Sequence, residues 1–278
     1  MSDWILLRGL TRETRHWGAF ESSMRAHGVL RDDDRAVFID LPGNGDERAM
    51  HVPLSVHAMM NDVRARAVAL GVTMSCRVLA MSLGAMVATA WAQQHPGEIE
   101  RLVLINTSMR PFARVDERLR VSAWPTLLRI ATQWNHPERC ERLIHALTCH
   151  RIDTIDTDIS EWAALRRTHG VSAGNALRQL YAAARFRAQP FAPPCPTLIL
   201  SSRSDRLVDN ACSERIAKQW RAKHAIHPWS GHDLPHDDAA WTCEAIATWL
   251  ADMHAMHATH AISEHDAKQA HHAFHSRK

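Results

Sequence analysis

Short apolar runs alternate with stretches of helical spacing along this chain, and that alternation restricts the folds open to it. Four runs in the first half have the composition of strands: 3–9, 35–41, 76–81 and 101–106. Helical patterns separate them at 16–28, 55–71 and 83–97. Strands that alternate with helices predict a parallel sheet with crossover helices. Runs that are apolar throughout indicate strands covered on both faces.

Between residues 110 and 190 the strand pattern stops and only helical patterns occur. Strand patterns return at 196–202 and 225–229, accompanied by helical patterns around 211–222 and 237–253. The fold class predicted from this order is α/β, with a mostly parallel sheet, helices on both faces and an inserted all-helical segment.

The domain organisation follows from the same order. We predict one α/β core, built of residues 1–109 and 191–256, with a helical insertion at 110–190. The remaining residues, 257–278, form a polar tail. Seven histidines lie from residue 254 onward, but their spacing gives no closed set of ligands, and we expect the chain to need no metal.

Composition argues against several classes of protein. Lys and Arg number 33 against 30 Asp and Glu, and a net charge of +3 disfavours a nucleic-acid partner. No apolar run is long enough for a bilayer, and no signal-peptide pattern opens the chain, so we expect a cytoplasmic protein without a membrane partner. Six cysteines without C-x-x-C spacing predict reduced, mostly packed thiols. The sequence leaves a homo-oligomer open.

The stretch "MSLGAM" at 81–86 places Ser82 between a predicted strand and a predicted helix. A chain that reverses sharply there presents the serine side chain at the edge of the sheet. Small neighbours are needed because the strand and helix backbones come close, and Ala80 and Gly84 meet that need. The pattern nearly matches G-x-S-x-G, with Ala80 in place of the first glycine. Backbone N–H groups of the following helix favour negative charge at this point.

A serine nucleophile needs a base, and the base needs a carboxylate that orients it. Asp205 follows the predicted strand 196–202, and His232 follows the one at 225–229. Both therefore fall at the same edge of a parallel sheet as Ser82. Asp209 competes with Asp205 for the acid position, but we expect it to cap the helix that follows.

Four motifs in this order resemble the α/β-hydrolase family, in its serine-nucleophile, esterase-like branch with a helical lid. They are "DLPGNG" (40–45), "MSLGA" (81–85), "SRSDRLV" (202–208) and "SGHDLPHD" (230–237). The resemblance covers nearly all of residues 2–253. It implies that the insertion is the lid and that the enzyme uses no cofactor.

The resemblance also implies a role for each matching residue. Ser82 is the expected nucleophile, His232 the base and Asp205 the group that orients it. The backbone N–H groups of Leu10 and Leu83 are expected to form the oxyanion hole, which does not depend on their side chains.

The sequence departs from the family at "LLRGL" (6–10), where Arg8 stands in place of the usual histidine. Two roles are open: Arg8 braces the loop through hydrogen bonds, or it contacts an anionic group of the substrate. Ser108, just beyond a strand, and Trp124, in the insertion, are further candidates for the substrate pocket.

These features predict a carboxylic ester hydrolase that acts on a small-molecule ester through a Ser-His-Asp acyl-enzyme mechanism. The same triad also serves C–C bond hydrolysis, thioester hydrolysis and a lyase reaction like that of the menaquinone pathway. A ligand-binding protein on this fold, without catalysis, is a further alternative. The intact triad disfavours it.

Overall fold

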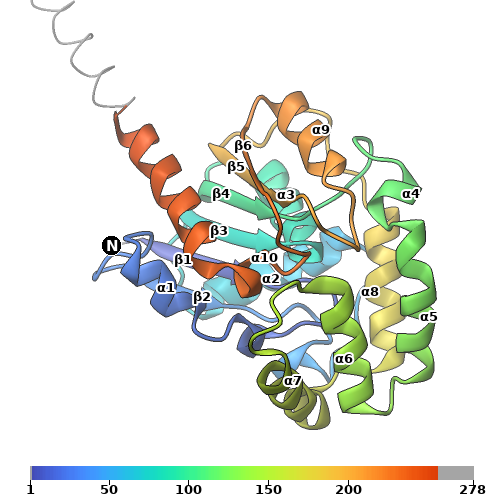
Figure 1. Ribbon diagram of the computed structural model, residues 1–278. Helices are drawn as coiled ribbons and strands as arrows, with labels where there is room; N and C mark the ends of the chain where they lie inside the picture. The colour runs from blue at the N-terminus through green and yellow to red at the C-terminus, as the bar shows by residue number, and fades with distance from the viewer. Residues whose placement is uncertain (1, 256–278) are drawn as a thin grey trace, which may run out of the picture.

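The computed structural model describes residues 2–255 and contains one six-stranded sheet in the order β2-β1-β3-β4-β5-β6 (Figure 1). All five strand pairs are parallel, as the alternation of strands and helices predicts. The strands are β1 (Asp3–Leu7), β2 (Arg35–Phe38), β3 (Cys76–Met81), β4 (Ile99–Ile105), β5 (Thr197–Ser202) and β6 (Lys223–His227). The histidine-rich tail at 257–278 lies outside the described residues.

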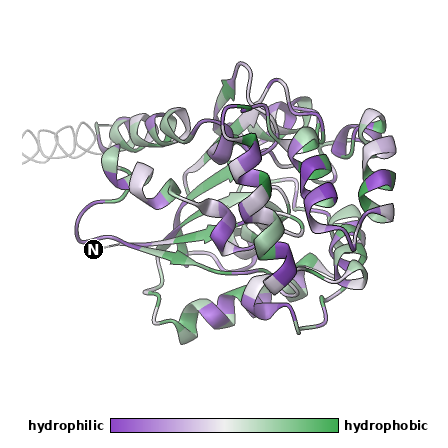
Figure 2. Cartoon of the chain, turned by 60° about the horizontal axis from the view of Figure 1, so that its bottom comes forward, coloured by the Kyte–Doolittle hydropathy of each residue, from purple (hydrophilic) through white to green (hydrophobic). Residues whose placement is uncertain are grey.

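Helices cover both faces of the sheet. One apolar cluster packs the sheet against α2 (Val56–Ala69), α3 (Leu83–Gln94) and α9 (Ala211–Trp220). A second cluster packs the opposite face against α1 (Phe20–Ala26) and a helix over 239–255. Successive β1 residues divide between them, since side chains alternate along a strand. In Figure 2 most of the sheet is coloured as apolar, and β1, β3 and β5 are buried along their whole length, whereas the edge strands β2 and β6 are not.

Several predicted elements differ in detail; the strand predicted at 225–229, for example, is observed as β6 over Lys223–His227. Strand β2 ends at Phe38, where the sequence predicts a strand to 41. The helical pattern at 16–28 divides into a short 3-10 helix, η1 (Thr14–Trp17), and α1, because Gly18 between them has a positive φ of 51°. The last helical pattern also divides, into α10 (Leu234–Asp237) and the helix over 239–255.

The segment between β4 and β5 is helical, as predicted. It contains α4 (Val115–Arg118), η3 (Val121–Ala123), α5 (Trp124–Thr132), α6 (Pro137–Thr148), α7 (Ile155–His169) and α8 (Ala173–Arg185). Its two ends meet at a bridge between Arg110 and Arg187. In Figure 1 these helices gather on one side of the sheet. Another 3-10 turn, η2 (Gly45–Glu47), follows β2.

No helix within residues 2–255 combines the length and the apolar character that a membrane crossing requires.

Candidate active site

Ser82 occupies a sharp turn between β3 and α3. Its φ is 52° and its ψ is −117°, a conformation that costs a non-glycine residue free energy and is typical of functional sites. The turn is held by hydrogen bonds from Ser82 N–H to the Ile105 carbonyl (2.9 Å) and from the Thr107 hydroxyl to the Ser82 carbonyl (3.1 Å). Gly84 is required because a Cβ there would lie 2.4 Å from the Arg8 carbonyl oxygen.

A hydrogen-bonded chain leads from Ser82 to Asp205 through His232. The Ser82 Oγ lies 3.0 Å from His232 Nε2, and His232 Nδ1 lies 2.7 Å from Asp205 Oδ2. The other Asp205 oxygen accepts the backbone N–H groups of Leu207 (2.8 Å) and Val208 (2.9 Å), which fixes the carboxylate. The structure therefore brings together the three side chains that the sequence selects for this site.

The electrostatics of His232 follow from its burial and its partner. Burial alone lowers the pKa of this imidazole, but the Asp205 carboxylate more than offsets it through its charge and hydrogen bond, so that the pKa is raised above its usual value. An imidazole of this kind accepts a proton and is stabilised once charged, which is what a general base needs.

Asp209 takes the role that the sequence assigns to it. Its Oδ1 accepts the N–H of Ala211, the first residue of α9, at 3.0 Å. Its other oxygen pairs with Arg120 at 3.2 Å. The competitor for the acid position is thus engaged at a helix N-terminus.

Asn106 is a central residue of the site that sequence reasoning missed. It follows β4 with a positive φ of 45°. Its side-chain amide donates to the carbonyl oxygens of His232 (2.8 Å) and Gly231 (3.2 Å) and to the Ser202 hydroxyl (3.0 Å), and its Oδ1 accepts the Ser202 N–H (2.8 Å). One buried side chain therefore ties the ends of β4 and β5 to the loop that carries His232. The only sequence signal is its place directly after a buried strand.

Arg8 forms a buried two-pronged ion pair with Asp233, the neighbour of His232. Arg8 Nη1 donates to Asp233 Oδ1 at 3.0 Å, and Nη2 donates to the other oxygen. Both residues are less than 5% exposed, and the guanidinium lies 4.8 Å from the centre of the Trp17 ring. Although burial opposes it, the charge of Arg8 lowers the pKa of Asp233 to about 2. These contacts have the form expected of a bracing residue.

The other residues selected from the sequence are the oxyanion-hole candidates Leu10 and Leu83 and the pocket candidates Ser108 and Trp124. The loop after β1 passes beside the serine, because a Cβ on Gly9 would lie 3.0 Å from the Ser82 Cβ. Leu10 in this loop is partly buried, and Leu83 at the start of α3 is fully buried. Ser108 is buried, whereas Trp124 on α5 is 51% exposed.

The C-terminal end of α6 docks onto the loop that carries His232, residues 228–233, which we call the histidine loop. The Asp237 carboxylate accepts N–H groups from Gly231 (2.6 Å), His150 (2.9 Å) and Arg151 (2.9 Å). This one carboxylate thus joins the helical insertion to the backbone next to His232.

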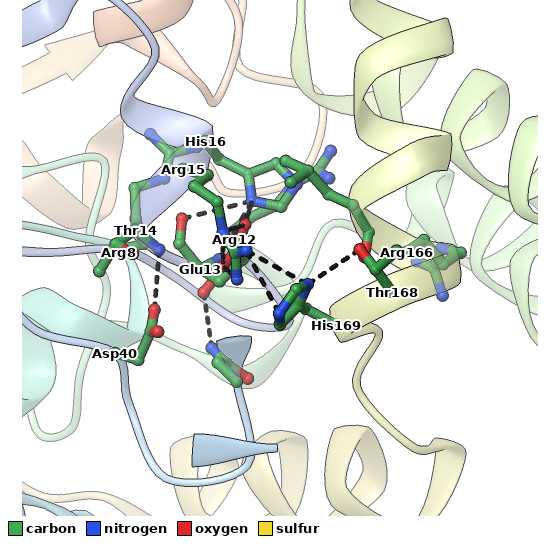
Figure 3. A network of polar contacts seen from close by, with 12 residues as sticks. Arg8, Arg12, Glu13, Thr14, Arg15, His16, Asp40, Arg166, Thr168 and His169 are labelled. Atoms are coloured by element: carbon green, nitrogen blue, oxygen red, sulfur yellow. Dashed lines mark hydrogen bonds and ion pairs between the residues drawn. The ribbon is translucent and has the colours of Figure 1, made fainter. Parts of the chain in front are cut away.

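A second polar network joins the loop after β1 to the insertion (Figure 3). Arg12 Nη1 and Arg166 Nε donate to the two oxygens of Glu141, each at 2.6 Å. Glu141 is almost fully buried, and the Arg12 guanidinium lies 4.3 Å from the centre of the Trp162 ring. One buried carboxylate of the insertion therefore binds a guanidinium of the core, Arg12, and one of the insertion, Arg166.

Asp40 stabilises the turn that the "PGNG" motif after it forms. Its carboxylate accepts the N–H groups of Thr14 (2.7 Å, Figure 3) and Asp46 (3.2 Å). Burial raises the pKa of Asp40 to about 6. The turn thus stands beside the loop after β1 without contributing a group to the Ser82–His232–Asp205 chain.

Two curated proteins are similar to this chain in sequence. The bifunctional biotin-biosynthesis protein BioHC of Teredinibacter turnerae is 31% identical over 104 residues, 37% of this chain, and the match spans only 17% of the BioHC chain. The RutD protein of Klebsiella pneumoniae, named as a carbamate hydrolase, is 25% identical over 272 residues, with 88% of this chain and 91% of RutD covered.

A solved structure with the same fold is the esterase EaEST from Exiguobacterium antarcticum. It superimposes with a TM-score of 0.72 at 13% identity, over 90% of this chain and 92% of the esterase. The family described as "Serine aminopeptidase, S33" matches residues 16–238, most of the 278 residues. The chain therefore belongs to this family of hydrolases and has the α/β-hydrolase fold.

Proposed function

We propose that this protein is a serine hydrolase that cleaves small to medium carboxylic esters. The observation that carries the proposal is the continuous chain from Ser82 Oγ to His232 Nε2 (3.0 Å) and from His232 Nδ1 to Asp205 Oδ2 (2.7 Å). Hydroxyl, imidazole and carboxylate in this order form the arrangement that activates a serine for attack on a carbonyl.

The reaction has two halves. Ser82 Oγ attacks the ester carbonyl carbon while its proton passes to His232 Nε2. The tetrahedral intermediate then collapses, and the alcohol leaves with that proton. A water molecule gives a proton to His232 and attacks the acyl-enzyme, and the second intermediate releases the acid and restores the Ser82 hydroxyl. Asp205 holds His232 in orientation and stabilises its charged form throughout.

The negative oxygen of each intermediate needs donors that are already in place. We assign this role to the backbone N–H groups of Leu10 and Leu83. The approach of Gly9 to Ser82 and of Gly84 to the Arg8 carbonyl supports it, because the loop after β1 packs directly on the first turn of α3.

The helical insertion is proposed as the lid over this site, with residues 110–190 as its bounds. Its ends meet at Arg110 and Arg187, and α6 docks beside His232 through Asp237. A helical layer in this position shapes the acyl pocket and excludes water from it.

The state of Arg8 bears on the rival reactions. Substrates of C–C bond hydrolases and of the menaquinone-pathway-like lyase carry carboxylates and need a free cation. Both terminal nitrogens of Arg8 are bound to Asp233, which favours neutral substrates. The likeness to RutD supports a carbamate as the second candidate substrate, since its carbonyl is open to the same attack.

A substrate panel tests the proposal. p-Nitrophenyl esters of graded acyl length are compared with an acyl-thioester, a carbamate and a carboxylate-bearing ester of equal length. Turnover that is fastest on one of the neutral esters, and absent in Ser82→Ala, is the expected result. Turnover of none of these substrates by the folded chain would refute the assignment, and turnover of the carbamate alone would replace the ester with the second candidate.

A further inference from the structure

A second group of reactive side chains lies beside the histidine loop and outside the Ser82–His232–Asp205 chain. One ring nitrogen each of His145 and His236 and the sulfur of Cys149 lie within 4.8 Å of one another. His145 and Cys149 are four residues apart, on the last turn of α6 and directly after it, so they face the same side. His236 comes from α10. Two elements far apart in sequence thus supply three potential ligands.

His145 carries a buried ring nitrogen that makes no hydrogen bond. The residue is 1% exposed, and its Nε2 has no hydrogen-bond partner although the atom is buried. Leaving such a nitrogen unsatisfied costs free energy, about 1–3 kcal/mol for a typical buried polar group. A buried imidazole nitrogen aimed into a cluster of sulfur and nitrogen is a ligand position for a metal.

Asp158 on α7 supplies a fourth donor. Its Oδ2 lies 3.1 Å from His236 Nε2 and 3.6 Å from His145 Nε2. Two ligand atoms on one tetrahedral zinc, each about 2.0–2.1 Å from the metal, stand about 3.3 Å apart. The carboxylate oxygen is therefore placed relative to both imidazoles as a co-ligand would be.

The charges around the cluster also favour a cation. Among residues 2–255, Asp158 forms ion pairs only with His145 and His236, and Asp237 forms none with an arginine or lysine. Asp237 accepts the N–H of His150, which places its carboxylate next to Cys149. Two carboxylates without a permanent cationic partner leave room for the charge of a divalent ion.

We propose that His145, Cys149, His236 and Asp158 bind one zinc-class divalent cation. A nitrogen, sulfur and oxygen donor set suits a borderline-soft ion of this class rather than calcium or magnesium. The ion ties α6 and α7 of the insertion to His236 on α10, which lies four residues after His232 in the chain. This makes it a structural clamp on the docking of the insertion, and the ester chemistry does not pass through it.

Cobalt(II) titration of the full chain tests the proposal, because a thiolate bound to cobalt gives a charge-transfer absorption that nitrogen and oxygen ligands do not. We expect this band to saturate at one equivalent and to disappear when zinc is added. The histidine-rich tail cannot produce it, because the last cysteine of the chain is Cys243. A wild-type protein that binds cobalt without the band, or binds none, refutes the site.

Two serine variants separate Cys149 from cysteines in general. Cys149→Ser should abolish the band, while Cys140→Ser, a fully buried cysteine on the same helix, should keep it. His145→Ala and His236→Ala should each weaken cobalt binding by tenfold or more. A band that survives in Cys149→Ser, or is lost only in Cys140→Ser, overturns the assignment.

X-ray absorption spectroscopy at the zinc edge, on the unmodified chain, keeps the proposal testable even if a variant does not fold. One equivalent of zinc should show one sulfur neighbour at about 2.3 Å and nitrogen or oxygen neighbours at about 2.0–2.2 Å. The same zinc should raise the melting temperature of the wild type and not that of Cys149→Ser. A shell without sulfur overturns the site.

Discussion

The side-chain amide of Asn106 donates a hydrogen bond to the backbone carbonyl of His232 at 2.8 Å. The imidazole is therefore positioned from two sides: Asp205 orients the ring, and Asn106 fixes the backbone that carries it. A residue outside the Ser82–His232–Asp205 chain thus helps to hold the imidazole in place.

Removing Asn106 tests this arrangement. Asn106→Ala leaves the Ser202 N–H and two loop carbonyls without their partner, so we expect the free energy of unfolding to fall by about 1–3 kcal/mol. We also expect kcat to fall by up to about 100-fold as the imidazole loses its position. Chemical denaturation and ester kinetics measure the two effects. Asn210→Ala, at a half-buried asparagine directly before α9, is the matched control, and equal effects in both variants would contradict the role.

Replacing the proposed nucleophile gives the sharpest test of mechanism. Ser82→Ala should lower kcat for ester hydrolysis by about 10³-fold or more while the fold is kept. Ser201 offers a matched control, because its hydroxyl also contacts an imidazole, His224 Nε2, at 2.8 Å. Ser201→Ala should keep wild-type activity. Half-normal turnover in folded Ser82→Ala would remove the serine from the mechanism.

The pH dependence of kcat/KM follows from the state of His232. Only the neutral imidazole accepts a proton, so activity should be lost as the pH falls through its pKa, which Asp205 raises above the ordinary value of about 6.5. Above that pKa the profile should be flat into mild alkali. Asp205→Asn should lower the pKa and reduce kcat by on the order of 10⁴-fold. Asp209→Asn should leave the profile unchanged, and an optimum near pH 4 in the wild type would be incompatible with this base.

Raising the pH through the pKa of His232 should increase activity but reduce the stability of the fold. Because the folded pKa of His232 is raised, its interaction with Asp205 stabilises the fold fully below the unfolded pKa of about 6.5, and this contribution is lost as the pH rises through the folded pKa. Activity therefore appears over the pH range in which this part of the stability disappears. Denaturation curves on either side of the transition, with Asp205→Asn as reference, measure the difference.

The buried ion pair between Arg8 and Asp233 predicts that a double variant is more stable than the single variant Arg8→Met. Arg8→Met leaves a buried carboxylate alone and should lower the free energy of unfolding by about 3–5 kcal/mol. Arg8→Met combined with Asp233→Leu should recover much of that loss, because no charge is then left unpaired. Arg8→His should slow neutral and carboxylate-bearing esters equally. A loss confined to the acidic ester would instead make Arg8 a substrate contact.

The sequence located Ser82, Asp205 and His232 because each follows a strand, and parallel strands present their carboxyl ends at one edge. It could not supply the partner of Arg8, which is 225 residues away in the chain. Local sequence patterns predict where a residue lies along a strand or helix. They do not predict which distant side chain it contacts in the folded protein.

The same limit explains the residues that were missed. Asn106 and Asp237 form hydrogen bonds with backbone groups. Because every residue has such groups, the sequence does not show which of them a side chain will bind. His145 and Cys149 have a spacing that many helices show by chance, and only the docking of α6 beside α10 brings His236 to them. We expected no metal because the chemistry of the triad needs none and the histidines of the tail lack the spacing of a ligand set, whereas the cluster lies among residues 2–255.

The bridge between Arg110 and Arg187 has a consequence for how such a protein diversifies. A segment that leaves and rejoins the sheet at one point can be lengthened, shortened or exchanged without pulling on the strands at either side. Whatever replaces it must keep only a few attachment points, above all the backbone N–H groups that reach Asp237. The insertion is in this sense a unit that can be exchanged while the sheet and its three reactive side chains stay as they are.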